Sequence, residues 1–138
     1  MSTATTEQAI IKALENNPFC AFGTVENNKP RVRYMALYND GLHIHLATDR
    51  KTHKVEELEQ NPNCYLLLGY EKGGNSEVVQ IEATCKVSSD SELKQRVWKD
   101  EFKKWLDGPD DPDYVVLDIT PQMIEYIDQD GNRQTWEA

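Results

Sequence analysis

The stretch Leu46-Ala47-Thr48-Asp49-Arg50-Lys51-Thr52-His53-Lys54 joins the end of an expected strand to the start of an expected helix. Its last five residues include three cations and a histidine, although a helix N-terminus carries partial positive charge and favours acidic side chains. Such a cluster is favourable when an anion is bound, and the hydroxyls of Thr48 and Thr52 with the Lys54 ammonium could converge on a phosphate. The same residues also fit an ordinary helix with surface lysines, capped by Asp49 or Thr52. The stretch therefore predicts a strand–turn–helix unit and leaves two interpretations of its charge.

Short apolar and alternating segments on both sides of this stretch predict further strands. We expect strands over residues 19–25, 31–38, 42–47, 64–70, 78–88, 114–120, 123–127 and 133–136, and helices capped at Thr5 and over 52–60 and 91–106. Segment 64–70 is apolar at nearly every position, which favours a strand buried on both faces. Asp40-Gly41 predicts a tight hairpin, because this pair tolerates positive φ angles. Short connections favour a mainly antiparallel sheet of six to seven strands, closed into a barrel and accompanied by about three helices.

Length and composition predict one small domain that gains burial by association. The chain has 138 residues, which suits a single domain over residues 1–138. Hydrophobic residues make up 38% of the chain and its mean hydropathy is -0.70, so little apolar material is left to close a large core. This composition favours a fold that buries more of its surface by dimerising.

The charge distribution argues against polyanionic partners but is compatible with a small bound anion. A net charge of -9 and a pI near 4.8 disfavour binding to nucleic acid or to anionic membranes. No apolar run approaches the ~18–20 residues of a membrane-spanning helix, and the first residues do not resemble a signal peptide. We therefore expect a cytoplasmic protein. Residues 29–54 nevertheless hold six Lys or Arg and two Asp, a local charge of +4, which suits either a bound anion or a solvated strand face.

The stretch resembles a motif of the pyridoxamine 5'-phosphate oxidase-like family, in particular of its short general stress protein branch. These relatives carry Thr-Asn-x-x-Ser-Arg-Lys between a strand and a helix, followed after the helix by Asn-Pro and an apolar strand. Here Thr48, Thr52 and Lys54 match in kind and spacing, and Asn61-Pro62 follows the expected helix. His53 stands where the family has arginine, which either weakens phosphate binding or shifts that role to Arg50.

Three further segments resemble the family and extend the similarity over residues 5–127. Pro30-Arg31-Val32-Arg33-Tyr34-Met35 is similar to an Arg-x-Met-like strand that contacts the flavin, with Arg33 matching the phosphate-binding arginine. Residues 108–114 resemble Gly-x-Asp-Asp-Pro, and residues 79–83 resemble Val-x-Ile-x-Gly with Ala83 at the glycine position. The resemblance implies an FMN-binding split β-barrel, dimeric, with two equivalent flavin sites between the subunits.

The resemblance also implies which residues bind the cofactor. They are Arg33, Tyr34, Met35, Thr48, Asp49, Thr52 and Lys54. FMN is favoured over FAD, because nothing obvious would hold an adenosine. The chain ends with a single arginine, Arg133, and lacks the Arg-rich C-terminal motif of the vitamin B6 oxidases. Oxidation of pyridoxamine phosphate is therefore not expected.

Two functions remain open at this point. One is an FMN-dependent oxidoreductase that exchanges electrons with a small-molecule redox substrate, although no side chain stands out as a catalytic base. The other is a non-catalytic flavin-binding module for stress response or redox sensing; a weaker alternative replaces FMN by haem or a deazaflavin. Trp98, Phe102 and Trp105 form one helical stripe, which favours core or dimer packing over a tryptophan that covers the flavin. His43 and His45 share a strand face but lack a third ligand, so we expect no metal.

Overall fold

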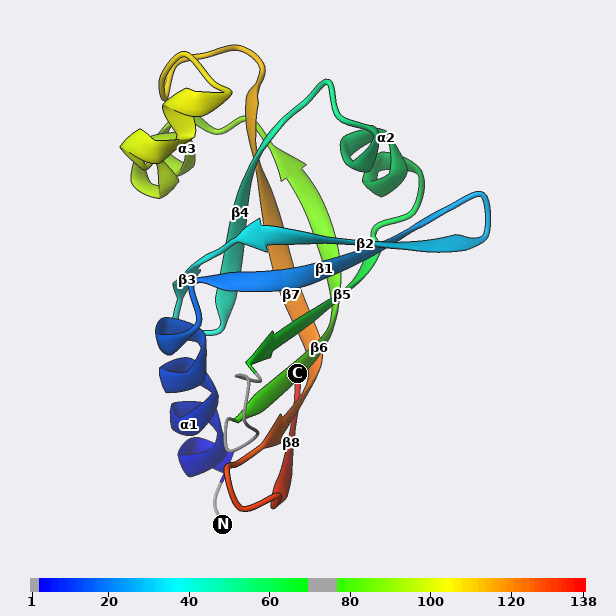
Figure 1. The fold of residues 1–138 in the computed structure, drawn as a ribbon, viewed down its shortest axis with the longest axis vertical. Coiled ribbons are helices and arrows are strands. Elements are labelled where there is room, and N and C mark those ends of the chain that lie inside the picture. Colours follow the sequence, from blue (N-terminus) through cyan, green and yellow to red (C-terminus); the bar gives the residue numbers. More distant parts are fainter. Residues whose placement is uncertain (1–2, 70–76) are drawn as a thin grey trace.

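The computed structural model describes residues 3–69 and 77–138, with the side chains of residues 3, 4, 53 and 54 left out. Its centre is a strongly curled sheet, with three helices placed around it (Figure 1). The helices are α1 (Thr3–Asn16), α2 (His53–Gln60) and α3 (Ser91–Val97), and a 3-10 helix, η1 (Asp100–Lys104), follows α3. No helix in the described part of the chain is long and apolar enough to span a membrane.

The described strands form one antiparallel sheet. They are β1 (Phe19–Glu26), β2 (Lys29–Ala36), β3 (Tyr38–Asp40), β4 (His43–Asp49), β5 (Asn63–Gly69), β6 (Val78–Ser88), β7 (Tyr114–Ile127) and β8 (Arg133–Glu137). Their order is β2-β1-β5-β6-β7-β4-β3, and β8 pairs with β7 outside this path. The mainly antiparallel split barrel with three helices is therefore confirmed, with eight strands in the described residues when the three-residue β3 is counted.

Two apolar clusters hold the sheet in this shape. The larger one fills the inside of the curl, where Phe22, Leu66 and Ile81 from neighbouring strands meet Ile10 and Leu14 of α1. The smaller cluster lies between α3, η1 and the sheet, and consists of Leu93, Val97, Phe102, Leu106, Tyr114 and Val116. Because both clusters contact β7, that strand is buried along most of its length.

Strand β7 corrects the expectation of two separate strands over 114–120 and 123–127. It runs without interruption for 14 residues, although Pro121 lies in its middle and cannot donate a backbone hydrogen bond. The register of the partner strand β6 shifts between Glu82 and Ala83, next to the Ala83–Pro121 pair. This irregularity accommodates the proline, as β-bulges do, and lets pairing continue beyond it.

Three other expectations are wrong in detail. The helix expected over 91–106 ends at Val97, because Trp98 adopts an extended backbone and packs edge-on against Phe102 and Tyr114 at centroid distances of 5.5 and 5.4 Å. Strand β5 is buried on one face only, since alternate residues point away from the core; Tyr70, the expected last residue, lies outside the described residues. Helix α1 begins before Thr5, which therefore does not cap it.

The hairpin expected at Asp40-Gly41 is present between β3 and β4. Asp40 pairs with His43, and Gly41 has a φ of 61° in the connection. A Cβ atom at Gly41 would meet nothing within 4 Å, and the same is true at Gly108, whose φ is not positive. The two glycines thus differ in backbone conformation but not in available space.

We expect Gly41→Ala to lower the free energy of unfolding by about 1–2 kcal/mol, the usual cost of the left-handed conformation for a residue with a side chain. Gly108→Ala, the matched control, should leave stability unchanged or raise it by about 0.4–1 kcal/mol through the unfolded state. Urea unfolding of both variants measures the difference. Equal effects at the two positions would contradict the assigned turn.

Candidate functional site

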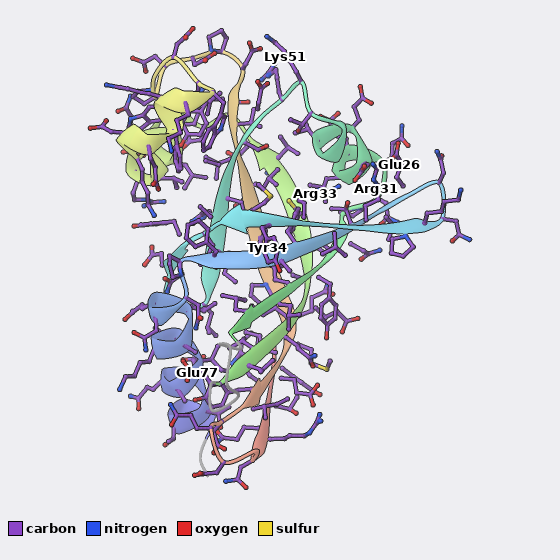
Figure 2. The ribbon with its side chains drawn as sticks, viewed as in Figure 1. Glu26, Arg31, Arg33, Tyr34, Lys51 and Glu77 are labelled. Carbon is purple, nitrogen blue, oxygen red and sulfur yellow. The ribbon has the colours of Figure 1, made fainter. Side chains whose placement is uncertain are left out.

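A cavity of about 540 Å³ lies between β2, β4 and the residues around η1. We call it the β2–β4 pocket. Its lining comprises Phe19, Arg33, Tyr34, Met35, Ala36, Ala47, Thr48, Phe102 and Trp105. Four of the seven residues assigned to the cofactor from the sequence are therefore brought together here, namely Arg33, Tyr34, Met35 and Thr48. Arg33 and Tyr34 lie next to each other on β2 (Figure 2).

Aromatic rings form much of the wall of this pocket. Phe19, Tyr34 and Trp105 are 61%, 87% and 52% exposed, which is unusual for side chains of this size. The Trp105 ring packs against the buried Phe102 ring, and the two ring centroids are 5.8 Å apart. Exposed ring faces grouped in one pocket suit a planar aromatic ligand, which can stack on them.

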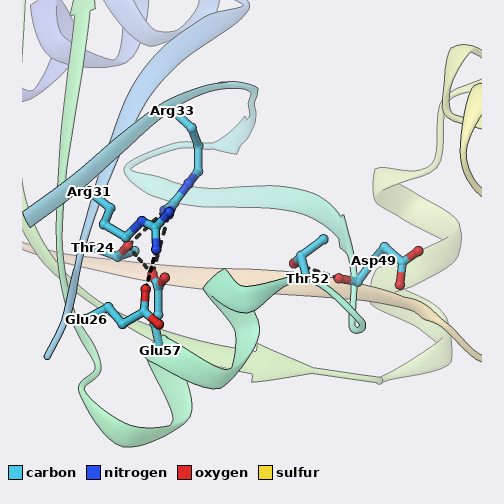
Figure 3. A network of polar contacts seen from close by, with 7 residues as sticks. All are labelled: Thr24, Glu26, Arg31, Arg33, Asp49, Thr52 and Glu57. Carbon is cyan, nitrogen blue, oxygen red and sulfur yellow. Dashed lines mark hydrogen bonds and ion pairs between the residues drawn. The ribbon is translucent and has the colours of Figure 1, made fainter.

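Arg33 reaches from the pocket into a buried polar network (Figure 3). Its Nη1 donates to Thr24 Oγ1 at 2.8 Å, and its Nη2 lies 3.4 Å from Glu57 Oε2 on α2. Thr24 Oγ1 in turn donates to the same carboxylate oxygen at 2.5 Å. Thr24 and Glu57 are buried, whereas the Arg33 side chain keeps about a quarter of its surface exposed. The threonine hydroxyl thus links a cation at the pocket to an anion beneath it.

Glu57 could not be identified from the sequence, because the spacing of apolar residues in α2 points to Val55 and Leu58 instead. Its Oε1 is buried and has no hydrogen-bond partner among the described residues. A buried carboxylate requires a compensating charge, and Arg33 provides it. An anionic ligand in the β2–β4 pocket would therefore share the Arg33 guanidinium with Glu57.

The turn between β4 and α2 is closed by its own side chains. Asp49 Oδ1 accepts a hydrogen bond from the Lys51 N–H at 2.8 Å, and the Thr52 hydroxyl donates to the Asp49 carbonyl at 2.9 Å. Thr52 occupies the N-cap position of α2. Asp49 and Thr52 thus shape the turn next to Thr48 and do not line the pocket. The Lys54 side chain lies outside the described residues, so its expected role stays a prediction.

The other two cations of the turn point to different partners. Lys51, at the tip of the turn (Figure 2), forms an ion pair of 2.9 Å with Asp113 in the acidic loop before β7. The hydrogen bond to Asp113 is the main reason that the pKa of Lys51 is raised. Arg50 Nη2 lies 3.3 Å from Ser89 Oγ at the end of β6. Neither side chain lines the β2–β4 pocket, so the basic cluster of the sequence is dispersed in space.

Cysteine and histidine side chains in the described residues lie outside the lining of the β2–β4 pocket. Cys20 and Cys64 are buried, and burial raises the pKa of each thiol to about 12, so both stay protonated near neutral pH. The His43 and His45 rings stack at 6.3 Å. Within residues 3–69 and 77–138, no group of three or more His, Cys, Asp or Glu side chains could hold a metal ion.

We expect Thr24→Val to lower the free energy of unfolding by roughly 1–3 kcal/mol, because it leaves the buried Glu57 carboxylate without its hydroxyl donor. Thr24→Ser keeps the donor and serves as the matched control, with a smaller loss. Urea unfolding monitored by tryptophan fluorescence compares the two variants. If Thr24→Val proves as stable as Thr24→Ser, the hydroxyl does not carry the network.

Comparison with known proteins places this chain in a family. The family model for pyridoxamine 5'-phosphate oxidase matches residues 6–128. General stress protein 26 of Bacillus subtilis is 37% identical over 122 residues, which cover 88% of this chain and 87% of that protein. The crystal structure of General Stress Protein 26 from Bacillus anthracis aligns with a TM-score of 0.85 and 29% identity, covering 95% of this chain and 98% of that one.

A more distant structure shares the fold alone. It is a pyridoxamine 5'-phosphate oxidase-related, FMN binding protein from Nostoc punctiforme, with a TM-score of 0.72, 14% identity and coverage of 100% and 99% of the two chains. The family match covers nearly the whole described chain and agrees with the motifs around Thr48 and Arg33. The chain therefore belongs to the pyridoxamine 5'-phosphate oxidase family.

Proposed function

We propose that the protein binds FMN in the β2–β4 pocket and uses it to transfer electrons to or from a small-molecule substrate. The observation that carries this proposal is the composition of the pocket, in which exposed aromatic rings stand beside the Arg33 guanidinium and the Thr48 hydroxyl. Such a pocket suits a ligand that is planar and aromatic at one end and anionic at the other. FMN has this form, and the Nostoc punctiforme protein with the same fold is an FMN binding protein.

Each group of residues would hold a different part of the cofactor. Arg33, Thr48 and Lys54 are the donors proposed for the phosphate, at the start of α2, where backbone N–H groups also face an anion. The Thr52 hydroxyl donates to the Asp49 carbonyl and would hold the turn in place beside them. Tyr34 and Trp105 would flank the ring system. When bound, the flavin supplies the redox chemistry, and the protein contributes binding, orientation and the electrostatic environment.

The site would be completed by a second copy of the chain. On the face of β2, β1 and β5, large apolar residues flank small ones in two cross-strand rows, Val32–Gly23–Tyr65 and Tyr34–Ala21–Leu67. Val32 is 70% exposed, and Tyr65 and Leu67 are 44% and 45% exposed. A groove of about 340 Å³ runs over Gly23 on this face. A continuous apolar sheet surface of this kind is typical of an interface.

This surface adjoins the proposed flavin site, because Tyr34 belongs both to the apolar face and to the lining of the β2–β4 pocket. We therefore propose a homodimer in which the partner covers the open side of each pocket. Stable interfaces bury about 800 Å² on each partner.

An absorbance titration with FMN, together with the mass in solution, tests the proposal. A perturbed flavin spectrum that saturates at one FMN per chain in a dimer supports it, and oxidation of a reduced nicotinamide by the loaded protein supports the oxidoreductase. Tight binding without turnover would favour the non-catalytic module. If the protein instead binds only haem or a deazaflavin, or no cofactor, the FMN assignment fails.

We expect Lys54→Ala to weaken FMN binding by roughly 1–3 kcal/mol, about 5- to 150-fold in Kd, through loss of a charge-assisted hydrogen bond to the phosphate. Lys51→Ala is the matched control, because Lys51 is paired with Asp113 outside the pocket and should leave the Kd nearly unchanged. Quenching of flavin fluorescence gives both constants. Similar constants for the two variants would remove Lys54 from the phosphate site.

We expect Leu67→Glu to convert the dimer to a folded monomer, because it places a charge in the middle of the apolar face. FMN affinity should fall with it, about tenfold or more, if the partner completes the site. Gln8→Glu, on the exposed face of α1, adds the same charge elsewhere and should change neither property. Light scattering reports the mass; a Leu67→Glu variant that remains dimeric would place the interface on another surface.

A further inference from the structure

A second cavity, of about 550 Å³, lies between α2 and the end of β6. We call it the α2–β6 groove. It shares no lining residue with the β2–β4 pocket. Its apolar wall includes Val55 and Leu58 of α2, Val87 of β6 and Val115 of β7, and its polar residues include Arg50 and Ser89. Its volume is within the range of small-molecule sites.

The groove runs along a strand edge that has no partner strand. Strand β5 begins at Asn63, opposite Thr84, so in the described residues β6 continues beyond β5 with this edge unpaired. The Cys85 N–H donates to the Pro62 carbonyl at 2.8 Å and thus points to this edge. In an antiparallel strand every second residue turns its N–H and C=O to the same side. The Val87 N–H therefore faces the groove as a backbone donor.

Arg50 supplies a cation at the same place. Its backbone N–H donates to the Asp113 carbonyl at 2.8 Å, which fixes the start of the side chain. The guanidinium contacts the Ser89 hydroxyl at 3.3 Å and forms no ion pair with any described residue. Glu59 is the acidic residue of the lining. In a chain with a net charge of -9, a guanidinium that contacts a hydroxyl instead of a carboxylate is available to an external anion.

We propose that the α2–β6 groove binds a small organic carboxylate with an apolar body. The carboxylate accepts hydrogen bonds from the Arg50 guanidinium and from the Val87 N–H, and the apolar body lies over Val55, Leu58 and Val115. A backbone donor, a guanidinium without an ion pair among the described residues and an adjoining apolar wall together match this class of ligand. The site does not depend on the flavin, because the groove shares no lining residue with the β2–β4 pocket.

The test uses phenylbutyrate and its uncharged analogue phenylbutyramide as probes of the full-length protein. We expect calorimetry to show that the carboxylate binds at least about tenfold more tightly than the amide, the contribution of a charge-assisted hydrogen bond. Amide NMR shifts should concentrate at Val55–Glu59 and Val87–Ser89. Equal affinities of the two probes, or shifts confined to the face of β2, β1 and β5, would overturn the proposal.

Variants separate the guanidinium from general charge effects. Arg50→Gln should weaken phenylbutyrate binding about tenfold, and Lys12→Gln, the matched control on the exposed face of α1, should not. Ser89→Trp should block the groove. FMN titration of Arg50→Gln should match that of the wild type, so failure of the carboxylate site and failure of the flavin site are distinguishable. Unchanged phenylbutyrate binding in both Arg50→Gln and Ser89→Trp would overturn the assignment.

Discussion

The hydrogen-bond ladder of β7 is the constraint on which the rest of the structure depends. This strand pairs with β6 along one edge, and along the other edge with β4 in its first half and β8 in its second. It can do so only because the shifted register at Glu82 and Ala83 carries the pairing past Pro121. Because β7 is continuous, it joins β4 and β8 to the same partner strand, β6, within one sheet.

The position of the proposed cofactor site follows from this ladder. Thr48 and Asp49 pair with Val115 and Tyr114 at the beginning of β7, so the turn that precedes α2 is held at that end of the sheet. β2 is the first strand in the order and β4 is the sixth, and the curl of the sheet brings these two strands together. The β2–β4 pocket is therefore a consequence of incomplete barrel closure, between two strands that are distant in the hydrogen-bonding order.

Helix α2 contacts two different groups of residues through two parts of its surface. On one side Glu57 faces Thr24 and Arg33, where a cation next to the core needs a buried partner. On the other side Val55 and Leu58 face the end of β6 and form the wall of the α2–β6 groove. The eight residues of the helix thus contribute to the charged network around Glu57 and to the apolar wall of the α2–β6 groove. Both depend on the turn that sets the start of the helix.

The sequence by itself determined the local units and the family. Apolar and alternating segments predicted most strands, Asp40-Gly41 predicted the hairpin, and the resemblance of the motifs around Thr48 and Arg33 to a known family implied the split barrel. Strands, turns and short motifs depend on residues that are close together in the chain, so their patterns can be recognised in the sequence.

Tertiary structure alone decided which charges meet and which faces stay open. Arg33 pairs with Glu57, 24 positions away, and Lys51 with Asp113, 62 positions away, because the curl of the sheet brings their elements together. One face of β5 is exposed, with alternate residues pointing away from the core. Helix α3 ends before Trp98, whose ring packs against Tyr114. Periodicity cannot contain this information, because it records the side of an element that is apolar but not the element that will cover it.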